Sequence, residues 1–212
     1  MSCYLKELNA VYYMGWNLMK KVPFSNQIGK FELHSEEGTI QRTRNTPVLG
    51  KCELEPLSFG YPWVVRTKDN YKMWYDTILK WESNSTSNYK FILRSALSND
   101  GVHWHKTYKQ NFPLFDKEKS IARPCIIFED GIFKMWCSVN YLGKYRLCYA
   151  ESNDGDNWKR MDDRIRWYGK KQNWESAEQT YPFLIQNNKS TFLLYNGNEY
   201  GKSGFGICRL EI

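Results

Sequence analysis

Short runs of alternating apolar and polar residues, separated by turns, fill most of the chain and predict β-strands. The clearest series is residues 122–158, which reads as four consecutive strands with many aromatic and β-branched positions. Residues 129–131, 140–143 and 152–155 supply the turns between these strands, because each contains a glycine that accepts a positive φ. Four antiparallel strands within about 40 residues are typical of one blade of a β-propeller.

The same pattern recurs along the chain. The Met-Trp pair at residues 73–74 returns at residues 135–136, and Ser-Asn-Asp-Gly-x-x-Trp at residues 98–104 returns at residues 152–158. The prolines that head the corresponding apolar runs are Pro62, Pro124 and Pro182. Self-similarity at this period predicts a propeller rather than a single sandwich. The expected repeats are residues 1–42 (partial), 61–108, 122–160 and 178–212.

The expected fold is therefore all-β: a single partial β-propeller domain over residues 1–212, with about three and a half blades of four strands. The first repeat lacks its first strand unless residues 1–8 supply one. The polar residues 82–88 are expected at a hairpin tip. We expect the three proline-headed strands to be the innermost strands of their blades, because a missing N–H is tolerated at a sheet edge.

Composition adds limits on the partners and the compartment. The net charge is +7, and residues 159–171 hold six basic and two acidic residues. That segment fits an acidic partner or a solvated loop, and the absence of a nucleic-acid-binding motif favours the loop, so no nucleic acid is expected. No run approaches the roughly 20 apolar residues of a membrane span, so no membrane partner is expected, and no secretion leader is visible.

The six cysteines contain no C-x-x-C pair, which favours reduced thiols in a cytoplasmic protein. If residues 142–143 form a two-residue turn, paired positions sum to 285. Cys137 and Cys148 are then directly opposed, because 137 + 148 = 285. We expect both to be reduced.

Eleven short motifs in this order span nearly the whole chain. They are Gly15-Trp16-Asn17 with Val22-Pro23-Phe24, Glu55-Pro56, Tyr61-Pro62, Arg123-Pro124, Met135-Trp136, Tyr149-Ala150-Glu151-Ser152, Trp174-Glu175-Ser176, Tyr181-Pro182, Tyr195-Asn196-Gly197-Asn198 and Gly204-Phe205-Gly206. Together they resemble the five-bladed β-propeller glycosidases, the superfamily of arabinanases, levansucrases and invertases (glycoside hydrolase families 43 and 32), in an uncharacterised bacterial branch.

The resemblance implies hydrolysis or transfer of glycosyl units by two aspartates and one glutamate from the first three blades, at the axial mouth of the propeller. Such chemistry needs one protonated and one ionised carboxyl. Five blades of about 60 residues need about 300, and the chain has 212. Aligned from its C-terminus, it looks N-terminally truncated and lacks both aspartate positions. We expect weak or no activity alone, and completion by a separately encoded segment or by self-association.

Three glutamates are the remaining candidate acids. The third-blade acid should stand just before Pro62, and Glu55 lies seven residues before that proline. Glu175 and Glu178 precede Pro182, although solvated loop charges are the favoured interpretation of this pair. The candidate substrate-binding residues are Trp16, Asn17, Arg123, Tyr181 and Asn196.

Several of these residues have alternative roles. Arg123 fits either the grip of a carboxylate or phosphate on a sugar or an ion pair with a neighbouring blade. Strand tryptophans stack on sugar rings or fill inter-blade core. His103 and His105 share one strand face without a third metal ligand, so no metal and no cofactor are expected. Asp100 and Asp154 are expected to form turns rather than to catalyse.

The expected function is that of a glycosidase-like, carbohydrate-active protein that acts on or binds glycans at the axial pocket. The alternative is a non-catalytic glycan-binding or assembly module. Sugar binding without turnover, unaffected by glutamine at the three candidate glutamates, distinguishes the second from the first.

Overall fold

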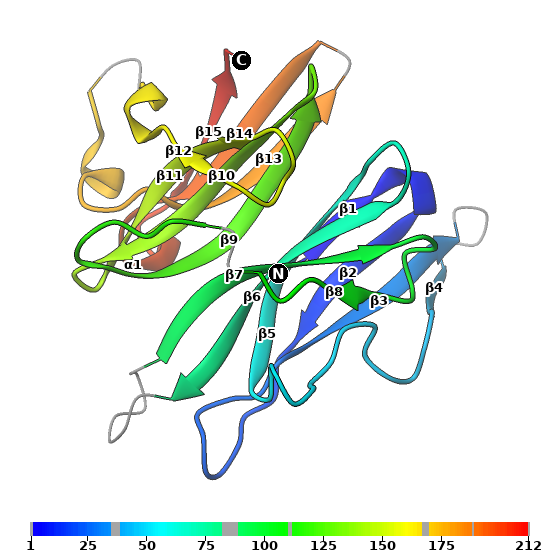
Figure 1. Cartoon of the computed structure of the whole chain (residues 1–212). Helices are drawn as coiled ribbons and strands as arrows, with labels where there is room; N and C mark the ends of the chain where they lie inside the picture. Colours follow the sequence, from blue (N-terminus) through cyan, green and yellow to red (C-terminus); the bar gives the residue numbers. More distant parts are fainter. Residues whose placement is uncertain are drawn as a thin grey trace. The chain divides into compact units, whose positions relative to one another are not determined.

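The computed structural model describes residues 2–34, 39–81, 89–109, 112–166, 170–187 and 189–211, and strands dominate them. They form four antiparallel sheets, three with four strands and one with three (Figure 1). The expected all-β fold is confirmed. The chain divides into two compact units, residues 1–111 and 112–212, and each unit contains two of the sheets. The division falls between the second and third expected repeats.

The first sheet contains four strands, although the sequence left its first strand open. They are β1 (Ser2–Leu5), β2 (Ala10–Gly15), β3 (Gln27–His34) and β4 (Thr39–Arg42). The opening residues do supply the first strand, because β1 pairs antiparallel with β2 after the 3-10 turn η1 (Lys6–Leu8). The structure therefore contains four sheets rather than three and a half.

The second sheet completes the first unit. Its strands are β5 (Ser58–Arg66), β6 (Tyr71–Trp81), β7 (Tyr89–Ser98) and β8 (His105–Lys106). The predicted hairpin tip at residues 82–88 lies outside the described residues.

The second unit contains the third and fourth sheets. The third consists of β9 (Glu118–Glu129), β10 (Ile132–Tyr141), β11 (Lys144–Ser152) and β12 (Lys159–Arg160). The fourth consists of β13 (Thr180–Asn187), β14 (Ser190–Asn196) and β15 (Phe205–Leu210). The described helical segments of this unit are η2 (Asp162–Arg164), η3 (Asn173–Glu175) and the four-residue α1 (Asn198–Gly201). No described helix is long and apolar enough to cross a membrane.

The predicted register of the β10–β11 hairpin is confirmed. Cys137 lies opposite Cys148, with a Cα–Cα distance of 5.2 Å. The two cysteines are joined by a disulfide, so the expectation that they stay reduced is wrong. The reason is geometric: directly opposed strand residues bring their Cβ atoms within the range that a disulfide spans. The other four cysteines are free.

The three proline-headed strands lie at the edges of their sheets, as expected from the missing proline N–H. Their position as innermost strands stays a prediction. Each strand has a bulge at the proline, and the residue before the proline has a positive φ. These residues are Tyr61 (φ 48°), Arg123 (φ 52°) and Tyr181 (φ 52°). Left-handed backbone is uncommon for a residue with a side chain, and a bulge re-aims the side chain that it carries.

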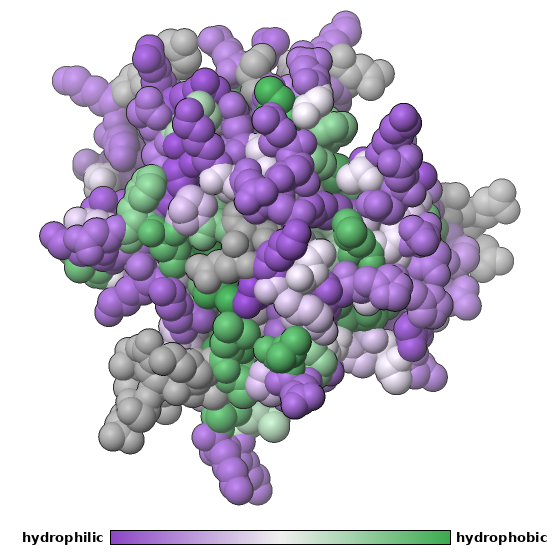
Figure 2. All heavy atoms as spheres, viewed as in Figure 1, coloured by the Kyte–Doolittle hydropathy of each residue, from purple (hydrophilic) through white to green (hydrophobic). Residues whose placement is uncertain are grey.

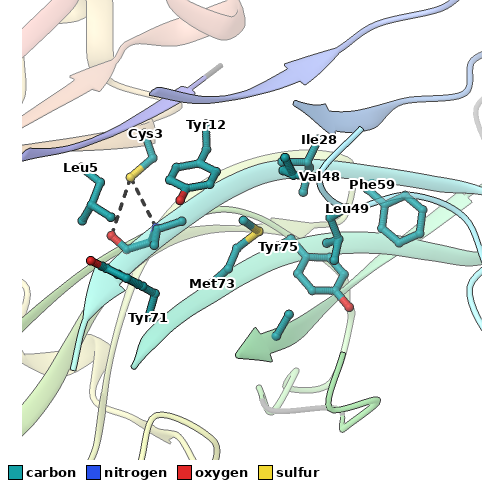
Figure 3. Packing of buried hydrophobic residues seen from close by; sticks show 12 residues of the cluster. Cys3, Leu5, Tyr12, Ile28, Val48, Leu49, Phe59, Tyr71, Met73 and Tyr75 are labelled. Carbon is teal, nitrogen blue, oxygen red and sulfur yellow. Dashed lines mark hydrogen bonds between the residues drawn. The ribbon is translucent and has the colours of Figure 1, made fainter. Parts of the chain in front are cut away.

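Both sheets of the first unit contribute to one hydrophobic core (Figure 3). Tyr12 and Ile28 from the first sheet pack with Met73 and Tyr75 from the second, and none of the four is exposed. The Cys3 thiol, drawn with dashed lines in Figure 3, contacts the backbone of Val64 on β5. Burial raises the pKa of this thiol to about 12, so Cys3 is an inert core residue.

Hydrophilic residues cover most of the face seen in Figure 2, and apolar residues reach it in small groups. Large hydrophobic side chains are nevertheless exposed in both units. They include Trp16 (52%), Leu18 (80%), Phe205 (73%) and Ile207 (62%).

Candidate functional site

Three tyrosines of the second unit gather into a cluster that we call the tyrosine cluster. Tyr181 on β13 lies 5.5 Å from Tyr145 on β11 and 5.8 Å from Tyr200 on α1, measured between ring centroids. Tyr145 and Tyr200 are 6.3 Å apart. Tyr200 is 60% exposed. The cluster therefore brings three aromatic rings together, of which Tyr200 is exposed and Tyr145 and Tyr181 are half-buried.

The β13 bulge fixes the position of Tyr181. Its backbone N–H donates a hydrogen bond to the Ser138 hydroxyl (2.7 Å), and the Thr180 hydroxyl lies 2.9 Å from the same oxygen. Ser138 is fully buried on β10. These bonds between neighbouring sheets hold Tyr181 in left-handed backbone, which costs on the order of 1–3 kcal/mol. Such strained residues concentrate at functional sites.

The segment that carries Tyr200 is also held in an unusual conformation. Glu199 and Tyr200 have φ of 54° and 59° inside α1. The Asn196 side-chain amide donates to the Tyr200 carbonyl (3.1 Å), and the Glu199 N–H donates to Glu178 Oε2 (2.7 Å). Asn198 Oδ1 accepts from the N–H groups of residues 177 and 178. The sequence-predicted Asn196 and Glu178 therefore both anchor Tyr200.

Arg123, at the bulge of β9 in the third sheet, contacts β13 in the fourth sheet. Its Nε donates to the Pro182 carbonyl (3.0 Å), and its Cζ lies 5.7 Å from the centre of the Phe183 ring. No salt bridge to Arg123 occurs within the described part of the chain. The contact with the neighbouring sheet is thus a backbone hydrogen bond rather than the ion pair considered from the sequence.

A polar residue stands opposite each bulge on the adjacent middle strand. Asp76 pairs with Gly60, Ser138 with Ala122 and Asn196 with Thr180. In each pair the partner directly precedes the left-handed residue. The bulge with a left-handed residue thus occurs in three sheets, and the polar residue opposite it is an aspartate, a serine or an asparagine.

Glu175 is buried rather than solvated, so the favoured loop-charge interpretation is wrong for this residue. It accepts hydrogen bonds from the Tyr195 hydroxyl (2.7 Å), Gln179 Nε2 and the Gln172 N–H. Burial raises the pKa of Glu175, but these hydrogen bonds outweigh it and hold the pKa below its usual range. The ionised, donor-saturated carboxylate is suited to positioning its neighbours.

Glu178 differs from Glu175 in having a less occupied carboxylate. It is half-buried, and the hydrogen bond from Glu199 uses only one of its oxygens. It lies beside the Tyr200 segment. Of the three candidate acids, Glu178 is therefore the one with an oxygen available to a ligand.

Glu55 lies in the first unit and is fully buried. Its carboxylate is 2.9 Å from Lys106 Nζ and 3.7 Å from Arg94 Nε, and it accepts hydrogen bonds from the Tyr75 hydroxyl. This environment favours a structural role, because the carboxylate faces two cations and no solvent. Its assignment to catalysis stays a prediction.

Trp16 and Asn17 also belong to the first unit, where they lie on an exposed loop. The Trp16 ring packs 4.9 Å from Phe24, and the Asn17 carbonyl accepts a hydrogen bond from the Ser25 N–H. The structure does not place them with respect to the tyrosine cluster. Their role in substrate binding stays a prediction.

Asp100 and Asp154 are turn formers, as expected. Asp100 Oδ1 accepts from the N–H groups of Val102 and His103, both at 2.8 Å. Asp154 makes the corresponding bonds in the third sheet. His103 pairs with Asp100 (2.7 Å). No group of three or more potential metal ligands occurs among the residues that the structure describes.

The basic segment at residues 159–171 is partly neutralised. Arg160 is nearly inaccessible and pairs with Glu118 and Asp162, while Arg164 pairs with Glu151 (2.6 Å). These pairs favour a structural role over an acidic partner for the described part of the segment.

The sequence analysis missed three residues of this site: Tyr145, Tyr200 and Ser138. Ser138 had a usable signal, because it lies 62 residues after Asp76, the same offset as the repeated prolines and Met-Trp pairs. Tyr200 carried no signal, since its left-handed conformation depends on hydrogen bonds that only the folded chain shows.

No known family model matches the chain. Two proteins of Mycobacterium tuberculosis are similar to it over 203 residues: "Uncharacterized protein MT1551" is 35% identical and "Uncharacterized protein Rv1502" is 34% identical. In both cases the match covers 95% of this chain and 67% of the relative. The chain belongs to the family of these two proteins. The expectation of uncharacterised bacterial relatives is confirmed.

Several solved structures of glycoside hydrolases share the fold of this chain. A thermostable family-43 glycoside hydrolase superposes with a TM-score of 0.72 at 14% identity, over 100% of this chain and 70% of that one. Another glycoside hydrolase gives 0.69 at 15%, over 96% of this chain and 62% of that one. The Bombyx mori GH32 β-fructofuranosidase BmSUC1 gives 0.67 at 14%, over 95% and 45%. At these identities the likeness shows the β-propeller fold alone, here with four blades.

Proposed function

We propose that this protein is a glycosidase-like, carbohydrate-active protein that binds glycans at the tyrosine cluster of its second unit. The observation that carries the proposal is the contact between Tyr181 and Tyr200, both in left-handed backbone, with Asn196 anchoring the Tyr200 segment. Arg123, also in left-handed backbone, donates to the carbonyl of the residue after Tyr181. Aromatic faces and fixed polar groups are what a sugar ring needs, because it has apolar C–H faces and a polar edge.

The fold supports a carbohydrate ligand. The solved structures with this propeller fold include a family-43 glycoside hydrolase and a GH32 β-fructofuranosidase. Fold alone does not fix function, so the proposal rests on the site and takes only the ligand class from the likeness.

Glycan binding with weak or no hydrolysis is the form of the proposal that the candidate acids favour. The buried Glu55 carboxylate lies between Lys106 and Arg94, and the Glu175 carboxylate accepts hydrogen bonds from Tyr195 and Gln179. Neither is poised to protonate a leaving oxygen. Glu178 is the remaining candidate for that role, because one of its oxygens has no hydrogen bond within the described residues.

The test is binding to a glycan array, followed by affinity measurements on the best ligand with Tyr181→Ala, Tyr200→Ala and Glu178→Gln. We expect the two tyrosine variants to lose about tenfold or more in affinity, since each removes an aromatic face. Tyr4→Ala is the matched control, because Tyr4 is a half-exposed tyrosine of the first unit. Unchanged affinity in both cluster variants contradicts the proposal.

Glu178→Gln distinguishes the enzyme from the non-catalytic alternative. If the chain turns over chromogenic glycosides and Glu178→Gln abolishes that turnover, Glu178 is the acid of a glycosidase. Binding without turnover in both proteins supports the glycan-binding module. Co-expression with the preceding open reading frame tests the expected dependence on a separately encoded segment, and light scattering tests self-association.

A further inference from the structure

We propose that the tyrosine cluster takes an anionic glycan, in which a sugar carries a carboxylate or a phosphate that Arg123 binds. This inference rests on the proposed glycan binding and specifies the class of sugar. The sequence left two roles for Arg123 open, and the structure shows no ion pair between Arg123 and a neighbouring sheet within the described residues.

The guanidinium of Arg123 is only partly used. Nε–H donates to the Pro182 carbonyl, which orients the planar group. Neither terminal nitrogen donates a hydrogen bond to any described residue, and no described carboxylate lies within salt-bridge distance. The two terminal nitrogens present parallel N–H groups that match the two oxygens of a carboxylate or phosphate. The side chain is half-buried, where an ion pair is stronger than it is in bulk water.

The backbone makes Arg123 a pre-positioned group rather than a free surface arginine. It sits in left-handed backbone directly before Pro124, and its Cζ lies 5.7 Å from the Phe183 ring centre. A side chain that is already held loses less conformational entropy when a ligand binds. Its hydrogen-bond acceptor Pro182 directly follows Tyr181 on β13, so Arg123 on β9 contacts the strand that carries Tyr181.

Each acidic group of the neighbouring segment accepts at least one hydrogen bond or ion pair, although Glu178 keeps one oxygen without a hydrogen bond within the described residues. Glu178 accepts the Glu199 N–H, Glu199 pairs with Lys202 (3.2 Å), and Glu175 is saturated by donors. A neutral sugar offers the guanidinium only hydroxyl oxygens, whereas an anion at the same place gains stronger, charge-assisted hydrogen bonds. The site should therefore prefer acidic over neutral glycans of the same backbone.

The experiment compares matched glycans that differ only in the charged group: a neutral oligosaccharide, its uronate form and its phosphorylated form. Affinities are measured by calorimetry for wild type, Arg123→Met and Arg123→Lys. Arg146→Met is the control, because Arg146 is an exposed arginine of the same unit that lies over the Tyr141 ring. Near-UV circular dichroism checks that the variants keep their tertiary packing.

We expect wild type to bind an anionic form about tenfold or more tightly than the neutral form, and added salt to reduce this preference. Arg123→Met should remove the preference, so that the variant binds the anionic and neutral forms with affinities within about threefold of each other. Arg123→Lys should keep part of it, since the charge remains but the fork is lost. The uronate and phosphate forms identify which anion the site takes.

Three outcomes overturn the inference. If wild type binds the neutral form as tightly as both anionic forms, while the Tyr181 and Tyr200 variants still weaken binding, the glycan site stands and the anion preference is wrong. If the preference survives in folded Arg123→Met, Arg123 is not its source. Failure of all glycans to bind refutes the proposed function together with this inference.

Discussion

The buried charges around Glu55 provide a stability prediction that can be worked from the structure. The Glu55 carboxylate is 1% exposed, and the side chains of Lys106 and Arg94 are 8% and 13% exposed. At separations of 2.9 and 3.7 Å, each attraction amounts to about 4–6 kcal/mol at an effective dielectric constant of about 20, and desolvation offsets much of it. Glu55→Gln removes both attractions and leaves two buried cations without a counter-charge.

We expect Glu55→Gln to lower the free energy of unfolding of the first unit by about 3–5 kcal/mol. Adding Lys106→Met should recover part of this loss, because it removes one of the unpaired charges. Glu199→Gln is the control: it breaks the pair with Lys202, whose side chains are 72% and 79% exposed, and should change stability by less than about 1 kcal/mol.

The assay is urea unfolding followed by tryptophan fluorescence, with hydrogen exchange to assign the transition to residues 1–111. A loss below about 1 kcal/mol in Glu55→Gln refutes the structural role, because it shows that the carboxylate does not hold the two cations. In that case Glu55 is again a candidate for the catalytic acid.

Three further predictions concern the alkylation of the cysteines, the substitution of two glycines and the pH dependence of the melting temperature. In denaturant without reductant, alkylation should modify four of the six cysteines, Cys137 and Cys148 being protected by their disulfide. In the folded protein Cys52 should react first, because hydrogen bonds from Tyr108 and Lys106 outweigh its burial and lower its pKa, whereas burial raises that of Cys208. Alkylation of Cys208 before Cys52 contradicts this.

Gly206→Ala should lower the melting temperature, because the added Cβ would lie 2.5 Å from the Tyr195 ring, which costs about 1–3 kcal/mol of stability. Gly15→Ala is the control and should be tolerated, because its Cβ would lie no nearer than 3.7 Å to any other atom. Equal melting temperatures for the two variants refute the close packing. Partial desolvation raises the pKa of Asp154, but hydrogen bonds from the N–H groups of Asp156 and Asn157 outweigh it and hold the pKa below its usual range. The stability that these bonds give is therefore present above about pH 4 and is lost as pH falls further. Asp154→Asn should therefore show a shallower loss of melting temperature between about pH 4 and 2 than wild type, and parallel curves contradict the assignment.

The strand pattern could be predicted from the sequence because its signals are local. Asp-Gly and Leu-Gly turns fix the hairpin register, and the Cys137–Cys148 pairing followed from counting across one such turn. The disulfide between these cysteines was not predicted, because the argument from cysteine spacing considered the compartment and not the geometry of opposed residues.

The candidate site was only partly predictable, since its formation depends on contacts between sheets. Arg123 and Tyr181 were found from the repeated prolines, but their left-handed backbone depends on bulges that no residue pattern announced. The burial of Glu175 was missed for the same reason: its donors, Tyr195 and Gln179, meet it only in the folded chain.

The most direct test of glycan binding at the tyrosine cluster is a crystal structure of the chain with the tightest ligand from the array. The account predicts a sugar ring against Tyr181 and Tyr200, with its polar edge toward Arg123. A ligand bound at Trp16 and Asn17 in the first unit, with the tyrosine cluster unoccupied, would contradict it.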